Sequence, residues 1–589
     1  MTEPKKPFPH VVDLSNYVLP PPRTLHELAM VKLSASIREK PNWWLKYTDP
    51  EIRARWRKEA QEMALVWIER ATMLVPFEDA SKYITGDHGQ GSILNSTVTL
   101  TEKEVDYILD ELDGYAKLRE EQSGIQASID KLHNSTILIG SDLLARLKKG
   151  VAVLEDVPDS ENDWHPGSNE QVLDLVHPSL YCVVYGRTLA YPRTNNTLTK
   201  TAASPAPLKP PTFVTLAREL SSQRFQWLPT DFSIDAEGKA KALSYINNLH
   251  PSHMELYDAV EGIISAFVPL FERVLTDMLN PLPHRIPGEY LPLKEVDPRH
   301  PQNEDAEDYY EELEGYIDNI WEEDRIVGLP QVPEEGYTGG REKRDNNVSL
   351  RGRTIQVIVK LANIHLTPEK PEYKGGSWHI EGMGNERIVS SGIYYYEQEN
   401  ITGSELAFRI AVDEPEPATK IQADTYDYHA HYKTWGMIMD YDDSTNLTNV
   451  VGATPTVEGR CLAFPNIYQH RVSPFRLTDP TKLGHRKILA LFLVDPNLEE
   501  PIPSTSIVPP QQQSWIKQAL HEAEPSTLLH KLPAELLDAI AKQASPEVMS
   551  EEDAKKFRLE LMEERSAQEK DDNRYDYDLY SRVFNLCEH

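Results

Sequence analysis

Apolar residues recur at helical spacing through the first part of the chain. Residues 24–40 carry this pattern, and the Asp-Pro-Glu sequence at residues 49–51 then combines an N-cap residue with proline at the first helical position. We predict that the helix opened by this cap runs to about Leu74. Residues 101–104 spell a capping box in front of another helical stripe. These patterns predict a mainly helical N-terminal region over residues 1–165, with the apolar stripes buried in a core.

The middle of the chain contains one long helical pattern and one polar, acidic stretch. A helix with a capping box is predicted to start at residues 252–255. The following section, residues 281–347, is rich in proline and acidic residues, and much of the negative charge falls in residues 303–324. Such a composition cannot bury much apolar surface, so we predict a solvated insert rather than a dedicated site for a basic partner.

From Arg353 onward the pattern becomes that of β-strands. Five short runs are rich in β-branched and aromatic residues, and turn-forming residues separate them. These runs are residues 354–366, 388–397, 404–412, 459–465 and 486–495. Short strands at this spacing are typical of a sandwich or jelly roll. After Pro501 a linker-like run leads into a polar, helical segment with a capping pattern at residues 550–553.

Composition and charge narrow the choice of function. The chain has 589 residues, 61 of them basic and 93 acidic, which gives a net charge of −32. This balance argues against nucleic acid as the main partner, because phosphate binding needs a basic surface. The three cysteines lie far apart, which argues against a thiolate zinc site or a disulfide framework. No signal core or membrane-length apolar run is present, so we expect an intracellular protein, cytoplasmic or nuclear and not secreted.

The residues that indicate chemistry lie among the predicted strands. His379 and Glu381 are two positions apart, so on a strand both side chains point to the same face. With His470, beyond a later strand, they supply the two imidazoles and one carboxylate of a facial-triad iron(II) site, and we call these three residues the metal triad. Arg486 opens the last apolar strand, where a guanidinium is costly unless an anion meets it. The sequence therefore offers a metal triad and a clamp for a carboxylate.

The order His-x-Glu, distal His and then Arg resembles that of the iron(II)/2-oxoglutarate-dependent oxygenases, whose fold is a double-stranded β-helix, a distorted jelly roll. More closely, several stretches resemble a fungal family of unknown function, the domain of unknown function 4246 family, and the likeness covers most of the chain. These stretches are residues 357–383, 394–402, 459–475 and 484–496. We therefore expect an α+β protein with a jelly-roll core over residues 170–500 and a helical C-terminal extension over residues 501–589.

The oxygenase resemblance implies a role for each candidate residue. The metal triad would bind Fe(II), and Arg486 would bind the distal carboxylate of 2-oxoglutarate. Oxidative decarboxylation of 2-oxoglutarate would then drive hydroxylation or oxidative demethylation of an unidentified small-molecule or protein substrate. Tyr396 and Asn363 are weaker candidates for lining the co-substrate pocket. The sequence indicates no oligomeric state.

Several alternatives stay open. Glu381 stands where most members of the oxygenase superfamily have Asp. His429 and His431 form a second pair at i and i+2 between the triad histidines, and they compete as ligands. The chain is also compatible with a non-catalytic jelly-roll binding or scaffold protein, or with a cupin-like metalloenzyme that uses the same ligands without 2-oxoglutarate. Arg486 together with the intact triad favours the oxygenase.

Overall fold

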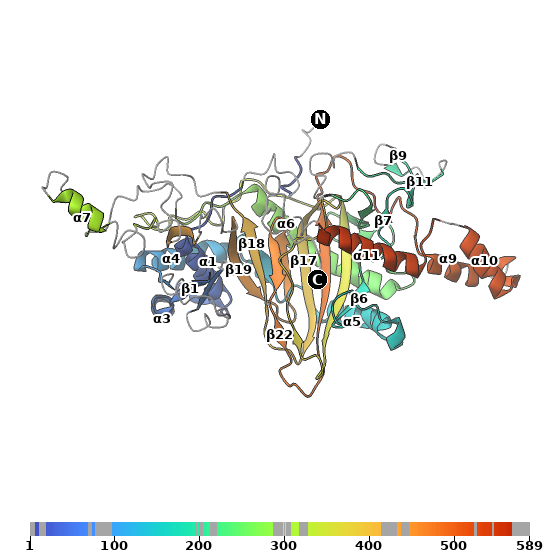
Figure 1. The fold of residues 1–589 in the computed structure, drawn as a ribbon, viewed down its shortest axis with the longest axis horizontal. Helices are drawn as coiled ribbons and strands as arrows, with labels where there is room; N and C mark the ends of the chain where they lie inside the picture. Colours follow the sequence, from blue (N-terminus) through green and yellow to red (C-terminus); the bar gives the residue numbers. More distant parts are fainter. Residues whose placement is uncertain are drawn as a thin grey trace.

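The structure, a computed structural model, describes most of the chain (Figure 1). The described residues are 6–10, 19–68, 73–76, 97–194, 197–198, 204–211, 221–286, 299, 301, 308–316, 328–413, 433–436, 447–523, 527–544 and 547–567. None of the helices in these ranges combines the length and the apolarity that crossing a bilayer requires.

The N-terminal region is largely helical, as its apolar pattern predicts. Its helices are α1 (Leu25–Arg38), α2 (Trp43–Lys46), α3 (Pro50–Glu62), α4 (Glu102–Leu118) and α5 (Ser141–Glu155). The capping box at α4 is confirmed, because the Thr101 side chain accepts from the Glu104 amide and the Glu104 carboxylate accepts from the Thr101 amide.

The helix predicted to reach Leu74 is wrong in its length, because α3 ends at Glu62 and a strand follows. This strand, β1 (Leu65–Ile68), pairs with β2 (Met73–Pro76) on one side and β3 (Thr97–Val98) on the other. All four β1 residues are buried. A central strand can bury consecutive residues on its two faces, whereas a surface helix buries only one stripe.

The largest sheet in the described part of the chain is nine-stranded and antiparallel. Its strands run in the order β14-β13-β15-β23-β17-β20-β5-β4, and β6 also pairs with β15. The bounds are β4 (Gln126–Ala127), β5 (His133–Ser135), β6 (Val172–Val176), β13 (Thr230–Ile234), β14 (Ala240–Ala242), β15 (Thr354–Leu366), β17 (Ile388–Glu399), β20 (Cys461–Pro465) and β23 (Gly484–Val494). Because β4 and β5 belong to this sheet, the N-terminal region and the β section share one hydrogen-bonded framework.

A smaller antiparallel sheet, β19-β18-β21, contains β18 (Glu405–Ala411), β19 (Thr448–Pro455) and β21 (Gln469–Val472). A further antiparallel pair joins β16 (Glu372–Tyr373) to β22 (Phe475–Arg476), which follows β21 in the chain. Short pairs join β7 (Val183–Val184) to β12 (Phe225–Gln226), β8 (Leu189–Ala190) to β11 (Ala206–Pro207), and β9 (Arg193–Thr194) to β10 (Thr197–Leu198). Each of the five predicted strand runs overlaps an observed strand, so the expectation of an α+β protein is confirmed.

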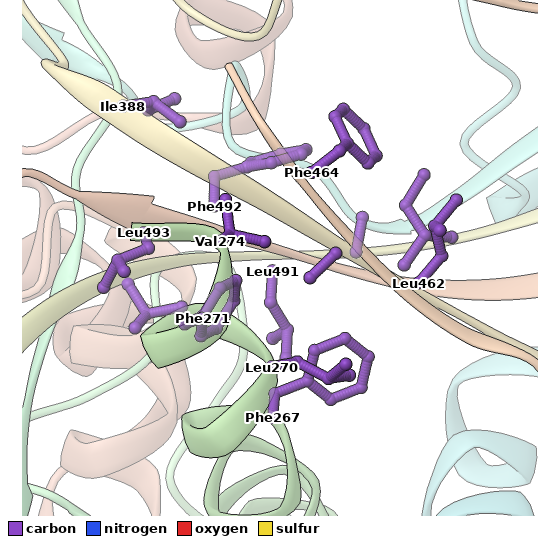
Figure 2. Close-up of a cluster of buried hydrophobic side chains, with 14 of the residues drawn as sticks. Phe267, Leu270, Phe271, Val274, Ile388, Leu462, Phe464, Leu491, Phe492 and Leu493 are labelled. Atoms are coloured by element: carbon purple, nitrogen blue, oxygen red, sulfur yellow. The ribbon is translucent and has the colours of Figure 1, made fainter. Parts of the chain in front are cut away.

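The long helix α6 (Met254–Leu279) packs on one face of the large sheet (Figure 2). Phe267 and Phe271 of this helix lie against Gly392 of β17, where a Cβ atom would come within 2.8 Å of the Phe267 ring. Glycine at this position therefore lets the helix approach the sheet closely. The predicted capping box of this helix is wrong: its N-cap is His253, with no side-chain cap bond.

The predicted acidic insert is only partly described, and its described second half is largely exposed but anchored to the core at a few residues. Helix α7 (Tyr309–Tyr316) lies in the acidic run, and residues 302–307 and 317–327 fall outside the described residues. In the following segment Arg341 pairs with buried Glu111, and Arg344 pairs with buried Asp277. Composition misses this anchoring because only a few residues make it, among them Arg341, Arg344 and the buried Val332, while the rest of the segment is polar.

The C-terminal extension contains α9 (Gln513–His521), α10 (Ala534–Ala544) and α11 (Glu551–Ala567). The capping pattern predicted before α11 is confirmed, because Ser550 and Asp553 exchange side-chain to backbone hydrogen bonds.

Candidate metal centre

The three residues of the metal triad converge in the structure. His470 lies on β21, and His379 forms a backbone bridge to it through two reciprocal hydrogen bonds of 3.2 and 2.9 Å. The Glu381 Oε1 atom lies 3.8 Å from Nε2 of His379 and 3.3 Å from Nε2 of His470. All three side chains are buried, and one ligand atom from each lies within 4.8 Å of the others. A single divalent ion can therefore contact all three residues.

The protonation of His379 suits a metal ligand. Its Nδ1 lies 2.9 Å from the backbone carbonyl oxygen of Ser377. A carbonyl only accepts, so Nδ1 carries the hydrogen, and in the neutral ring Nε2 keeps its lone pair. That lone pair is on the nitrogen nearest Glu381, which is the arrangement usual for a histidine that binds a metal.

Asn466 holds the backbone of Glu381 in place. Its Oδ1 accepts from the Glu381 amide at 3.0 Å, and its Nδ2 donates to the Glu381 carbonyl at 2.8 Å. Asn466 belongs to the turn between β20 and β21, so one side chain ties the Glu381 loop to the segment that carries His470. Sequence analysis missed this residue, although a polar side chain directly after a buried strand was an available signal.

Arg486 is a buried cation that no hydrogen-bond acceptor meets among the described residues. The residue is 1% exposed, and Nε, Nη1 and Nη2 all lack a partner. The guanidinium lies over the ring of Phe475, 4.3 Å from its centroid, and 5.7 Å from that of Tyr395. Burial lowers the pKa of Arg486, although Tyr395 and Tyr373 oppose the effect. The position of Arg486 is therefore suited to receive an anion.

Arg486 and the metal triad lie on the same side of the large sheet. Arg486 and Phe492 occupy alternate positions of β23, so both side chains point to one face. Phe492 pairs with Ser391, which in turn pairs with Phe464 of β20. The centroid of the Phe464 ring lies 4.9 Å from that of His470 on β21. The face of the large sheet that carries Arg486 therefore packs against the small sheet that carries His470.

Asn363 and Tyr396, the weaker candidates for the co-substrate pocket, lie on the other face. Asn363 pairs with Lys487, the neighbour of Arg486, and donates to Glu155 of α5 at 2.6 Å. The Tyr396 hydroxyl donates to Asn363 at 3.4 Å. A β-bulge in β17 between residues 395 and 397 displaces Tyr396 from the alternation, and Tyr395 faces Arg486 instead. The bulge cannot be read from the run of three tyrosines.

A second buried cluster consists of His165, Asp174 and His177. Sequence analysis did not single it out. Two of its contacts are to protein groups, since Nδ1 of His165 lies 2.9 Å from Asp174 and the Ser179 amide donates to Nδ1 of His177 at 3.2 Å. Nε2 of His165 and Oδ1 of Asp174 meet no hydrogen-bond partner among the described residues. With Nδ1 accepting, the hydrogen of neutral His177 is on Nε2, which is then a donor and not a ligand. This tautomer makes the cluster the weaker of the two candidate metal-binding groups in the described part of the chain.

The competing pair His429 and His431 lies outside the described residues. The structure therefore leaves the choice between that pair and the triad to experiment, while the triad itself is assembled without them.

Comparison with known proteins gives no curated match and only distant structural likeness. A bsmA homolog from Methylobium petroleophilum is 13% identical with a TM-score of 0.13, over 24% of this chain and 43% of that one. IDO from Bacillus thuringiensis is 11% identical with a TM-score of 0.13, over 24% and 46%. The Fe(II)/(alpha)ketoglutarate-dependent dioxygenase TqaL is 11% identical with a TM-score of 0.21, over 47% and 70%. The chain thus spans less than half the length of the bsmA homolog and of IDO, and we infer nothing from structural similarity this low.

Family models give a clearer result. The model described as "Protein of unknown function (DUF4246)" matches residues 102–519. The model described as "Domain of unknown function DUF4246, N-terminal" matches residues 1–59. The resemblance read from the sequence is thus confirmed, and the chain belongs to the DUF4246 family.

Proposed function

We propose that this protein is an iron(II)- and 2-oxoglutarate-dependent oxygenase. One observation carries the proposal: a buried His-Glu-His set lies on the same side of the large sheet as a buried guanidinium that meets no hydrogen-bond acceptor among the described residues. The first is a ligand set for a divalent metal, and the second is a receptor for a carboxylate. A metal-binding dicarboxylate would satisfy both.

The order of the strands supports a double-stranded β-helix. Along the chain, β15, β17, β20 and β23 belong to the large sheet, where they are neighbours in the order β15-β23-β17-β20. The intervening segments, the His379 bridge, β18, β19 and β21, belong to the small sheet. The chain thus passes back and forth between two sheets whose inner faces meet at Phe408, Phe464 and His470. This alternation is what a jelly roll requires.

The residues present fit both groups. Two imidazoles and one carboxylate suit Fe(II) and leave coordination positions open, and the longer side chain of Glu381 does not prevent convergence with the histidines. Arg486, without an acceptor of its own, fits the distal carboxylate of 2-oxoglutarate. When bound, iron and 2-oxoglutarate together supply the oxidising chemistry for attack on a substrate C–H bond.

The protein's own contribution is orientation and the exclusion of water. Ser377 fixes the ring of His379, and Asn466 fixes the backbone of Glu381, so both ligands are preorganised. The buried ring of Phe475 lies under Arg486 and shields its guanidinium from water. The attraction between the guanidinium and a carboxylate is stronger in such dry surroundings than in water. The substrate, a small molecule or a protein side chain, stays open.

The test is turnover without a prime substrate. Iron-loaded protein under air should convert 2-oxoglutarate to succinate, and omission of Fe(II) or the His470→Ala change should abolish the product. A parent that binds Fe(II) but neither binds nor consumes 2-oxoglutarate would overturn the proposal and favour the cupin-like alternative. A parent that binds neither would favour the non-catalytic binding protein.

A further inference from the structure

The loop that carries Glu381 is held by a second buried carboxylate, that of Glu386. One of its oxygens accepts from the Met383 amide at 2.6 Å, which closes the loop on itself. The other accepts from the Trp227 amide at 2.7 Å, which ties the loop to the chain beside β12. Glu386 is 1% exposed, so these contacts form away from water. Glu386 thus sets the shape of the turn that follows the metal ligand.

Glu386 receives its positive partner from the far end of the chain. Nη2 of Arg565, in α11, lies 3.4 Å from Glu386 Oε1. The Arg565 guanidinium also lies over the ring of Trp227, 4.1 Å from its centroid. Trp227 in turn stacks on Phe492 of β23. Helix α11 therefore reaches both the ligand loop and the inner face of the large sheet.

The sequence of α11 is built for this contact. Ala554, Arg558, Leu561 and Arg565 recur at helical spacing, and all four are buried. Half of the buried stripe is thus arginine, and each arginine meets a carboxylate of the core. Arg558 makes two hydrogen bonds to Asp163, of 2.7 and 2.9 Å. Helix α11 is therefore anchored by ion pairs as much as by apolar packing.

We propose that docking of α11 and binding of metal at the triad are energetically coupled through Arg565 and Glu386. The proposal rests on the metal site of the proposed function and does not require 2-oxoglutarate. Arg565 and Glu386 are positioning residues, since neither belongs to the ligand set. With α11 docked, Arg565 opposes the rise that burial causes in the pKa of Glu386. The ionised carboxylate accepts from both amides and holds the loop in its ligand-bearing shape. Without Arg565, a buried carboxylate tends to take up a proton, and its O–H would then oppose an amide that donates to it.

Coupling of this kind is reciprocal, so it can be measured from both ends. Mn²⁺ titration by calorimetry in the absence of oxygen, with the His470→Ala variant to identify the site, measures the first end. Arg565→Ala should weaken Mn²⁺ binding on the order of tenfold, the usual effect of losing an outer contact of a metal ligand. Arg565→Lys should recover part of the affinity. Arg224→Ala, which removes an exposed ion pair between Arg224 and Glu560 of α11, is the matched control and should bind Mn²⁺ like the parent.

The reverse effect, that of metal binding on the docking of α11, can be measured without a substitution near α11. Hydrogen exchange of residues 551–567 in the full-length parent should slow when Mn²⁺ is added, and the effect should vanish in His470→Ala. Equal Mn²⁺ affinity in Arg565→Ala and parent, or exchange of α11 that ignores Mn²⁺, would overturn the coupling while leaving the metal site intact. A parent that binds no Mn²⁺ would overturn the metal site itself, and with it the coupling.

Discussion

Replacing Arg486 by methionine should make the protein more stable and remove co-substrate binding at the same time. Burying an ion costs several kcal/mol, and stacking on Phe475 recovers about 2 kcal/mol of it. No described residue offers the guanidinium a hydrogen-bond acceptor, so without a ligand most of its desolvation free energy is not compensated. We therefore expect Arg486→Met to raise the free energy of unfolding by about 1–3 kcal/mol in the absence of 2-oxoglutarate.

The same substitution should weaken 2-oxoglutarate binding by about 10- to 100-fold, because hydrogen bonds to a charged group contribute about 1.5–3 kcal/mol. At a concentration 100 times the parent's Kd, 2-oxoglutarate should stabilise the parent by about 2.7 kcal/mol. A variant with 100-fold weaker binding should gain only about 0.4 kcal/mol under the same conditions. Arg486→Lys, which keeps the charge but not the two-pronged geometry, should lie between them.

Urea unfolding of Mn²⁺-loaded protein with and without 2-oxoglutarate measures both effects. The matched control is Lys487→Met, one residue along β23 on the opposite face, where Lys487 pairs with Glu155 and Glu397. It should lose stability and keep the response to 2-oxoglutarate. If Arg486→Met were less stable than the parent and equally stabilised by 2-oxoglutarate, the assignment of Arg486 as a carboxylate receptor would be refuted.

Three further predictions follow from buried contacts. His470→Ala should lose Mn²⁺ binding while His177→Ala keeps it, as measured by calorimetry; the opposite result would move the metal to the second cluster. Burial raises the pKa of Glu111, but Arg285 and Arg341 outweigh it and lower the pKa to about 2 from 4.5. Ionised Glu111 therefore stabilises the fold above about pH 4.5, and this contribution of roughly 3 kcal/mol is lost as the pH falls towards 2. Urea unfolding should find Glu111→Gln less stable at pH 7 by this order, with a gap that narrows in acid; a gap independent of pH would contradict the pairing. Arg344→Ala, which removes one partner of buried Asp277 while His133 stays paired with it, should cost about 1.5–3 kcal/mol, whereas an unchanged thermal midpoint would support the solvated-insert prediction.

Local patterns in the sequence predicted the strands well, and they singled out three residues that the structure brings together. The runs at residues 354–366 and 486–495 are long and apolar enough to specify buried strands whatever surrounds them. His379 and Glu381 were singled out by strand alternation, but only His379 forms a β-bridge, and Glu381 converges on it from a bend. Arg486 was found because a single cation in an apolar run is conspicuous.

The features that sequence analysis missed depend on contacts between distant segments. Asn466 matters only because the Glu381 backbone lies beside it. From its sequence, α11 is predicted to be a polar extension, because half of its buried stripe is arginine. The carboxylates that pair with these arginines lie 395 and 179 residues earlier in the chain. The bulge that turns Tyr396 to the outer face has no marker such as glycine. The roles of such residues depend on contacts between segments far apart in the sequence, and hydrophobic periodicity does not reveal these contacts.

The most direct test of the central claim is the visible spectrum of Fe(II)-loaded protein titrated with 2-oxoglutarate in the absence of oxygen. We predict a weak charge-transfer band that grows to saturation, because 2-oxoglutarate would contact the metal held by His379, Glu381 and His470. The band should need much more 2-oxoglutarate in Arg486→Met and should be absent in His470→Ala. A parent that holds Fe(II) at the triad and develops no band at any concentration of 2-oxoglutarate would contradict the account.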